Sequence, residues 1–385
     1  MTTLLPGITS VTPHRKTYLQ KETMTTSPAS RNVPPHPPTQ GLPEKDTAPE
    51  AHSARFDVLR VSACLAVILL HLSATIVLDR EFIWSAGWYV AVMTDAATRW
   101  CVVGFIMLSG ALLLSPEKHA HPNEFWAKRL HRLLPALIVW PTIYLAWRYM
   151  FWKEPLTPEL IAHDLFAGRP YIHLHFLFLI AGLYLVTPLL ATLVRHLNPA
   201  QLRQAILIIG FLAMAANLFD VHASSAFTMF VPYLAYYLAG WYCVRVMEKQ
   251  PRRYVPIIGG TIAVMTATSV YLVSALGLSN RWSFYPFEDF SPTGIALAIA
   301  MFTFILHGQI SPRIEALAQP LAPLTLGVYL AHPIVVELLR YGYFLSMPIL
   351  LHPPYYIPVT FLATCALTFG LVTLMQRVPG LRRIV

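Results

Sequence analysis

The chain has 385 residues, of which 56% are hydrophobic and 12% are charged, with a mean hydropathy of +0.53 and a formal net charge of +9. Soluble domains carry roughly 25% charged residues, so this composition excludes an ordinary soluble protein and indicates an all-α integral membrane protein. The positive charge does not point to nucleic acid as a partner, because the chain has no basic run with interleaved aromatic residues.

Residues 1–54 form a distinct N-terminal segment. The first fifty residues contain nine prolines and many Ser, Thr and charged residues, and they show no apolar periodicity. A segment of this composition buries too little apolar surface to offset the entropy lost on ordering. We therefore predict a disordered, Pro-rich cytoplasmic tail over 1–54, followed by a transmembrane domain over 55–385.

Apolar stretches long enough to cross a membrane recur through the rest of the chain. A spanning helix needs about 20 mostly apolar residues. The second candidate stretch is long enough to be tilted or bent, and the fifth is short. The candidates predict a bundle of about ten transmembrane helices over 57–78, 88–114, 133–151, 173–194, 203–219, 226–246, 254–278, 291–310, 320–341 and 356–377.

The charged residues between these stretches predict the orientation of the chain. With the N-terminal tail in the cytoplasm, most Lys and Arg residues fall in cytoplasmic loops, and acids such as Glu154 and Asp289 fall on the opposite side. Cytoplasmic loops carry an excess of Lys and Arg, and acids are weak signals. Because the excess repeats at almost every turn, we predict that both termini are cytoplasmic.

His71 lies deep in the first predicted span, in the stretch RFDVLRVSACLAVILLHLSA over residues 55–74. An ionisable group in lipid is costly and is by default a candidate functional residue. Arg60 comes eleven residues earlier, which places both side chains on one helix face about 16 Å apart. A neutral histidine there suits proton abstraction from a hydroxyl, and an arginine at the cytoplasmic mouth suits a phosphate. The alternatives are a histidine bonded between helices and an arginine that only sets topology.

Other arginines lie at the start of the third span and inside the second. Arg129 and Arg132 are three residues apart, hence neighbours on one helix face. Two adjacent guanidinium groups would bind a polyphosphate, and topogenic charge is the equal alternative. Arg99 follows Asp95 by four residues, the favourable order for an ion pair, so we expect either a structural clamp or a substrate contact.

The fourth span opens with two histidines. His173 and His175 are two residues apart, so on a helix they do not face each other, which argues against a metal site formed by the pair. We expect both to lie at the outer interface, where Tyr171 and other aromatic residues form an anchoring belt.

The ninth span carries a histidine and an acid. His332 precedes Pro333, and a proline frees the backbone carbonyl one turn earlier for a polar partner. A structural role for His332 therefore competes with a catalytic one. Glu337 lies near the outer end, where it can reach water. The sequence contains no HExxH, GxSxG or Walker motif, so we expect no metal and no ATPase mechanism.

Together these stretches resemble acyltransferase family 3, the multi-span membrane acyltransferases that modify surface sugars, over roughly residues 55–377. One departure occurs in the fourth span, where the family pattern has a tryptophan and this chain has His175. The stretches that carry the resemblance are RFDVLRVSACLAVILLHLSA, TRWCVVGFIMLSGALLL, FWAKRLHRLLP, HLHFLFLIAGLYLVTPLL, YYLAGWY and LGVYLAHPIVV.

The resemblance implies an O-acetyltransferase of the bacterial inner membrane that moves an acetyl group from cytoplasmic acetyl-CoA to a hydroxyl of a cell-envelope sugar or polysaccharide. His71 would be the general base, and Arg99 would orient the acyl group or stabilise the oxyanion. Arg60, Arg129 and Arg132 would hold the nucleotide phosphates, and the pantetheine arm would follow the helix face that Arg60 shares with His71. Candidate contacts to the substrate are Asp95, His173, His175, His332 and Glu337.

Two other functions remain open from the sequence. A transporter or exporter of a lipid-linked sugar or acyl compound would also use intramembrane ionisable groups, with His71, Arg99 and Glu337 along the path. A sensor or scaffold accounts for the tail better than for the buried charges. The expected partners are acetyl-CoA, a sugar or glycan acceptor and membrane lipid, with no nucleic acid, and a homodimer is left open.

Overall fold

The computed structural model describes residues 49–115, 122–221, 225–247 and 250–385. Within these ranges the regular elements are helices, and no strand occurs. The longer ones are α1 (Pro49–Val77), α2 (Ala86–Thr98), α3 (Cys101–Leu113), α4 (Pro122–Met150), α5 (Pro158–Phe166), α6 (His175–His196), α7 (Pro199–Leu218), α8 (Leu234–Arg245), α9 (Tyr254–Leu276), α10 (Pro292–His307), α11 (Pro312–Leu321), α12 (Thr325–Ser346) and α13 (Pro353–Arg377). The short 3₁₀ turns are η2 (Pro251–Arg253), η3 (Arg281–Phe287), η4 (Ala322–Leu324), η5 (Pro348–Leu351) and η6 (Leu381–Arg383).

The predicted tail lies outside the described residues except for its last six positions, which form the start of α1. The helix therefore begins at Pro49, before the predicted boundary at residue 54. Glu50, Ala51 and Ala54 are good helix formers, so the helix continues into residues that are too polar to be counted as part of a membrane span.

Several helix starts follow one local rule. An N-cap side chain accepts a hydrogen bond from the first turn, and a proline comes next, where its missing N–H is not needed. At α7 this becomes a full capping box, in which Asn198 and Gln201 each accept from the other's backbone N–H. The N-cap and proline pairs are Thr157 and Pro158, Asn198 and Pro199, Ser291 and Pro292, and Ser311 and Pro312.

Among the described residues, eight helical segments are long and apolar enough to cross a membrane, which confirms the all-α integral membrane fold. Two predicted spans are not among the eight. The span 133–151 coincides with α4 as far as Met150, and the first turns of this helix carry Lys128, Arg129 and Arg132. The span 226–246 is wrong as a continuous helix, because α8 covers only Leu234–Arg245, about 18 Å at 1.5 Å per residue.

The residues before α8 account for this short helix. From Ser225 the backbone makes tight turns in which an N–H donates to the carbonyl three residues earlier. Examples are the Val231 N–H to the Thr228 carbonyl (3.0 Å) and the Tyr233 N–H to the Phe230 carbonyl (3.0 Å). Pro232 lies among them and has no N–H to donate. Apolar composition continues through the turns, so hydropathy alone cannot locate the start of the helix.

The predicted second span, 88–114, divides into α2 and α3 at Arg99 and Trp100. The last residue of α2 is Thr98, whose hydroxyl donates to the carbonyls of Thr94 (2.9 Å) and Asp95 (3.0 Å). Such side-chain bonds compete with the helical ladder and bend helices. The break places the Arg99 side chain at a helix junction rather than in the middle of a straight span.

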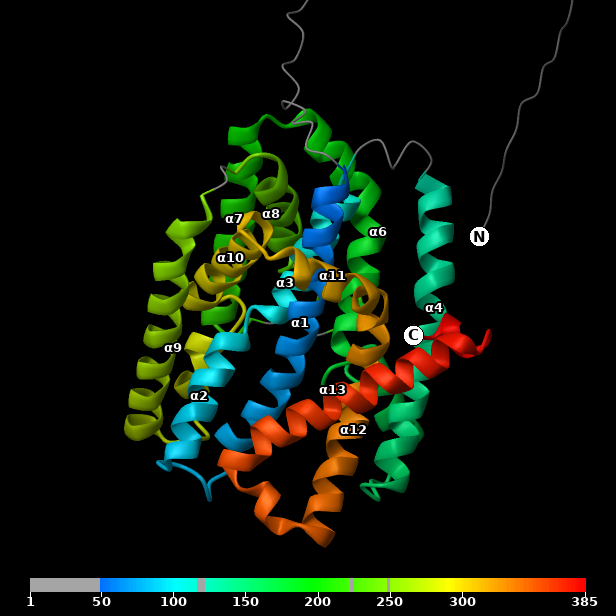
Figure 1. The fold of residues 1–385 in the computed structure, drawn as a ribbon. Coiled ribbons are helices and arrows are strands. Elements are labelled where there is room, and N and C mark those ends of the chain that lie inside the picture. The colour runs from blue at the N-terminus through cyan, green and yellow to red at the C-terminus, as the bar shows by residue number, and fades with distance from the viewer. Residues whose placement is uncertain (1–48, 116–121, 222–224, 248–249) are drawn as a thin grey trace, which may run out of the picture. The chain divides into compact units, whose positions relative to one another are not determined.

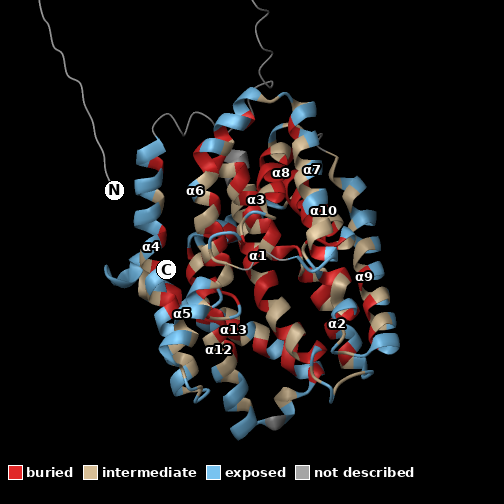
Figure 2. Ribbon diagram, turned by 180° about the vertical axis from the view of Figure 1, so that it is seen from behind, coloured by how far each residue is buried: buried red, intermediate tan, exposed pale blue. Residues whose placement is uncertain are grey.

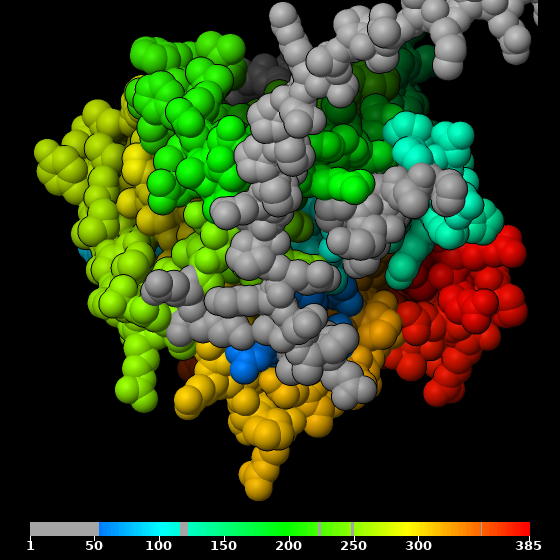
Figure 3. Space-filling model, turned by 90° about the horizontal axis from the view of Figure 1, so that it is seen from above, coloured from blue at the N-terminus to red at the C-terminus, as the bar shows by residue number. Residues whose placement is uncertain are grey.

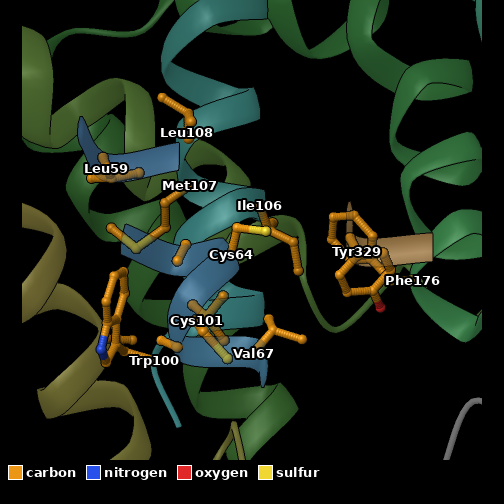
Figure 4. Packing of buried hydrophobic residues seen from close by; sticks show 14 of the residues in the cluster. Leu59, Cys64, Val67, Trp100, Cys101, Ile106, Met107, Leu108, Phe176 and Tyr329 are labelled. Carbon is orange, nitrogen blue, oxygen red and sulfur yellow. The ribbon is translucent and has the colours of Figure 1, made fainter. Parts of the chain in front are cut away.

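Helix α1 lies at the centre of the bundle, and α4 and α9 lie at opposite edges (Figures 1 and 2). Helix α1 contacts α2, α3, α10, α11, α12 and α13. Figure 4 shows the resulting core, in which Leu59, Cys64 and Val67 of α1 pack among buried side chains of α3, α6 and α12. The central position of α1 means that groups along its length are surrounded by protein.

Helices α3 and α8 cross at two glycines. A methyl group on Gly110 would overlap the carbonyl oxygen of Tyr237, and one on Gly240 would overlap that of Met107. Small residues allow this close approach of backbones in membrane helices.

We expect Gly240→Ala to lower the unfolding temperature of the purified protein, because overpacking against a backbone carbonyl costs about 1–3 kcal/mol. Gly259→Ala is the matched control: Gly259 lies in α9 with nothing within 4 Å of an added methyl group, so this change should leave stability equal or higher. Thermal unfolding in detergent measures both. Equal unfolding temperatures for the two variants would contradict the close crossing.

Candidate functional site

His71 lies near the end of α1 and lines a cavity of about 710 Å³. Its other walls come from the second half of α12, the segment 151–172 after α4, η5 and the start of α13. Most of this lining is apolar and aromatic, including Phe151, Tyr341 and Tyr356, and Arg340 is exposed at its edge. The cavity therefore brings the imidazole of His71 into a space that can hold a ligand.

The rings of His71, His332 and His173 form a row that leads from this cavity into the protein interior. The ring centroids of His71 and His332 are 5.2 Å apart, and those of His332 and His173 are 5.6 Å apart. His332 is 0% exposed and His173 is 1% exposed. Tyr144 and Tyr329 cover the ring of His173, so this residue is buried within the protein, and its place near the outer membrane interface stays a prediction. His175 is only partly covered, and Ile172 O accepts from its Nδ1 (2.9 Å).

The carboxylate of Glu337 is held by three donors in the cavity wall. Trp147 Nε1 donates to it at 2.6 Å, Trp152 Nε1 at 3.2 Å, and the Tyr171 hydroxyl also donates to it. Burial raises the pKa of Tyr171, so this hydroxyl keeps its proton and remains a donor. Glu337 therefore links α12 to α4 and to the segment before α6, rather than only reaching water as expected.

Arg148 fastens the segment that carries Tyr171. Its guanidinium donates to both oxygens of Glu154 (2.6 and 2.7 Å), to Asp164 (2.6 Å) and to the Pro170 carbonyl (3.0 Å). The hydrogen bond from Arg148 lowers the pKa of Glu154, so the pair persists at neutral pH and is lost as the pH falls through that lowered value. Arg148 thereby fixes the cavity wall at the residue preceding Tyr171.

The predicted ion pair between Asp95 and Arg99 is confirmed, with an N–O distance of 2.7 Å. Asp95 is 1% exposed. Arg99 also lies 5.1 Å from the ring centre of Phe287 and interacts electrostatically with Asp289. The Tyr233 hydroxyl donates to that second carboxylate (2.7 Å). One guanidinium thus interacts with the buried Asp95 and with the partly buried Asp289.

Arg60, Arg129 and Arg132 gather around Tyr184 of α6. The Arg129 guanidinium lies 5.7 Å from the ring centre of Tyr184, and Arg60 interacts electrostatically with both Arg132 and Tyr184. Arg60 also contacts Asp57 at 3.4 Å. Figure 3 looks onto this end of the bundle and shows the start of α4 at the rim, with α1 nearer the middle beside α11. Three cations, with Asp57 beside Arg60, form a site suited to an anionic ligand.

The face of α1 between Arg60 and His71 is closed in this structure. Cys64 and Val67 lie on that face one and two turns after Arg60, and they are 1% and 2% exposed. The Cys64 thiol contacts the Thr325 carbonyl at 3.7 Å. The expected path of the pantetheine arm along this face is therefore filled with side chains, and a ligand has to separate α1 from its neighbours to use it.

The predicted residues form two groups that the sequence could not assemble. His71 and Glu337 line the cavity, and the rings of His332 and His173 lie behind His71. Arg99 and His175 interact electrostatically with His71, and Asp95 is paired with Arg99. Arg60, Arg129 and Arg132 form the second group. Tyr184 and Asp289 were not singled out. A tyrosine hydroxyl inside an apolar span was a usable signal for Tyr184. The sequence placed Asp289 in a loop between spans and gave no sign that it lies near Arg99. Among the described residues, no cluster of three or more His, Cys, Asp or Glu could hold a metal ion.

The comparisons with known proteins give one match. A family model described as an acyltransferase domain matches residues 53–373. The searches of curated proteins and of solved structures give no match.

Proposed function

The chain belongs to acyltransferase family 3, and from this membership we propose that it transfers an acetyl group from cytoplasmic acetyl-CoA to a hydroxyl of a cell-envelope sugar or polysaccharide. Its family and its membrane-spanning helices make it a multi-pass membrane acyltransferase. The proposal adds the donor, the acceptor, the bacterial inner membrane as location and cytoplasmic termini.

The separation of two sites along α1 is the observation that carries the proposal. Arg60 and its neighbouring arginines lie at one end of this helix, and His71 lies at a cavity about 16 Å further along. An anionic nucleotide suits the first site, and an uncharged acceptor with a hydroxyl suits the second. A donor bound at the first site and an acceptor bound at the second would meet near His71 once the pantetheine arm separates α1 from its neighbours.

In the proposed reaction His71 acts as general base. Its ring nitrogen takes the proton from the acceptor hydroxyl, and the oxygen forms a bond to the carbonyl carbon of the thioester. The tetrahedral intermediate carries an oxyanion, which Arg99 stabilises. The carbon–sulfur bond then breaks, the thiolate of CoA takes the proton from the imidazolium, and the acetyl ester and free CoA are released.

Release of CoA thiol separates this proposal from transport. Purified protein in lipid vesicles is given acetyl-CoA on the Arg60 side, with and without an extract of envelope glycans. An acyltransferase releases thiol when acceptor is present and places a label from the acetyl group on the glycan. Movement of acceptor across the vesicle membrane without thiol release would reject the proposal in favour of a transporter.

Arg129→Ala should weaken donor binding, because a charge-assisted contact to a phosphate contributes about 1.5–3 kcal/mol, which is roughly a 10- to 150-fold rise in KM for acetyl-CoA. Arg203→Ala is the matched control, since Arg203 is an exposed arginine of α7 outside the Tyr184 cluster. Steady-state kinetics with each substrate varied in turn measure the effect. Equal rises in KM for donor and acceptor would reject the assignment of Arg129.

A further inference from the structure

The ring of His332 is held in one tautomer. Its Nδ1 lies 2.7 Å from the carbonyl oxygen of Tyr329. A carbonyl only accepts hydrogen bonds, so Nδ1 carries the hydrogen, and Nε2 of the neutral ring is a bare acceptor. Pro333 is the reason: it lacks the N–H that would normally donate to the Tyr329 carbonyl, and His332 supplies the missing donor.

The bare Nε2 of His332 is buried without a partner. The side chain is 0% exposed, and no hydrogen bond to this atom occurs within the described part of the chain. A buried acceptor left unsatisfied costs about 1–3 kcal/mol. Such an atom in a native protein calls for an explanation, and a role as a temporary acceptor explains it.

Two hydroxyl donors next to His332 are already engaged elsewhere, whereas the ring of His173, 5.6 Å away centre to centre, has no hydrogen-bond partner at either nitrogen within the described residues. The Tyr329 hydroxyl donates to the His173 carbonyl (2.6 Å), and the Tyr144 hydroxyl donates to the Leu330 carbonyl (2.7 Å). The ring of His71 lies 5.2 Å away, centre to centre and tilted by 40°. Within the described residues this ring makes no hydrogen bond of its own, so one nitrogen can face the cavity while the other turns toward His332.

We propose that His332 is the positioning residue for His71. One nitrogen of the His71 ring takes the proton from the acceptor hydroxyl, and the N–H on the other nitrogen donates to Nε2 of His332 during the reaction. This inference rests on the proposed function, in which His71 is the base. A general base works best when a third group fixes its tautomer and then stabilises its protonated form. Hydrogen bonds of this kind are often long in the free enzyme and shorten when substrate binds.

Two substitutions at His332 separate positioning from structure. An asparagine amide can replace Nδ1 and keep the bond to the Tyr329 carbonyl, but it does not reach the position of Nε2. A glutamine reaches that position and offers an acceptor oxygen there. We expect His332→Asn to lower kcat about 100-fold with both KM values unchanged, and His332→Gln to retain kcat within about tenfold. Retention by His332→Asn together with loss in His332→Gln would overturn the proposal, because only the carbonyl contact would then matter.

Pro333→Ala tests the same idea in a variant that keeps the fold. It restores a helical N–H to the Tyr329 carbonyl and releases His332 from its fixed tautomer. We expect an equal or higher unfolding temperature with a fall in kcat of about tenfold. Unchanged kcat would overturn the positioning role. An active His71→Ala variant would instead defeat the proposed function, whereas an inactive His71→Ala variant beside a fully active His332→Asn variant would defeat this inference alone.

Discussion

Replacing His71 with alanine should reduce acetyl transfer by about 10²–10⁴-fold, the usual contribution of a general base. The side chain lines the cavity rather than filling the core, and its ring makes no hydrogen bond within the described residues. Its removal therefore leaves the packing of α1 largely unchanged. We expect normal expression and an unfolding temperature close to that of the parent protein.

The kinetic pattern should be specific. The arginines around Tyr184 lie about three helical turns from His71, so KM for acetyl-CoA should stay constant while kcat falls. His196→Ala is the matched control, because His196 is an exposed histidine at the end of α6 whose Nδ1 contacts the Thr192 carbonyl. Activity is followed by thiol release and by label on the glycan. A purified His71→Ala protein with full turnover would remove the base from the mechanism.

Relations within one helix were predictable from the sequence. The four-residue spacing of Asp95 and Arg99 predicted their ion pair, and the proline at position 333 predicted a freed carbonyl that His332 now satisfies. Both follow from helix geometry and from the missing N–H of proline. Such relations depend on a few neighbouring residues, and the rest of the fold does not change them.

Relations between helices were not predictable in the same way. Periodicity identifies the side chains that share a face of a helix, but it does not say which other helix covers that face. The approach of His332 to His71, the burial of His173 and the gathering of three arginines around Tyr184 all depend on how α1, α4, α6 and α12 pack. The short α8 shows a second limit, since apolar turns and apolar helix have the same hydropathy.

The pair of Asp95 and Arg99 was left as either a clamp or a substrate contact, and its burial makes the two roles separable. Arg99→Ala leaves the Asp95 carboxylate, 1% exposed, without its cation, and it also removes a cation that interacts with Asp289. Breaking a buried pair from one side costs about 3–5 kcal/mol. We therefore expect a large fall in unfolding temperature and poor yield for this single variant.

The double variant Asp95→Ala with Arg99→Ala should recover most of that stability, because replacing both partners removes the unpaired charge. Asp289 keeps the hydrogen bond from Tyr233 in this background. If Arg99 is only a structural clamp, the stable double variant should also regain the turnover of the parent protein. If Arg99 stabilises the oxyanion, as proposed, the double variant should fold and bind acetyl-CoA. It should turn over about 10²–10³-fold more slowly, which is the usual cost of losing one oxyanion donor. Thermal unfolding and single-turnover kinetics on the same preparation measure both quantities, and full turnover in the stable double variant would reject the catalytic role of Arg99.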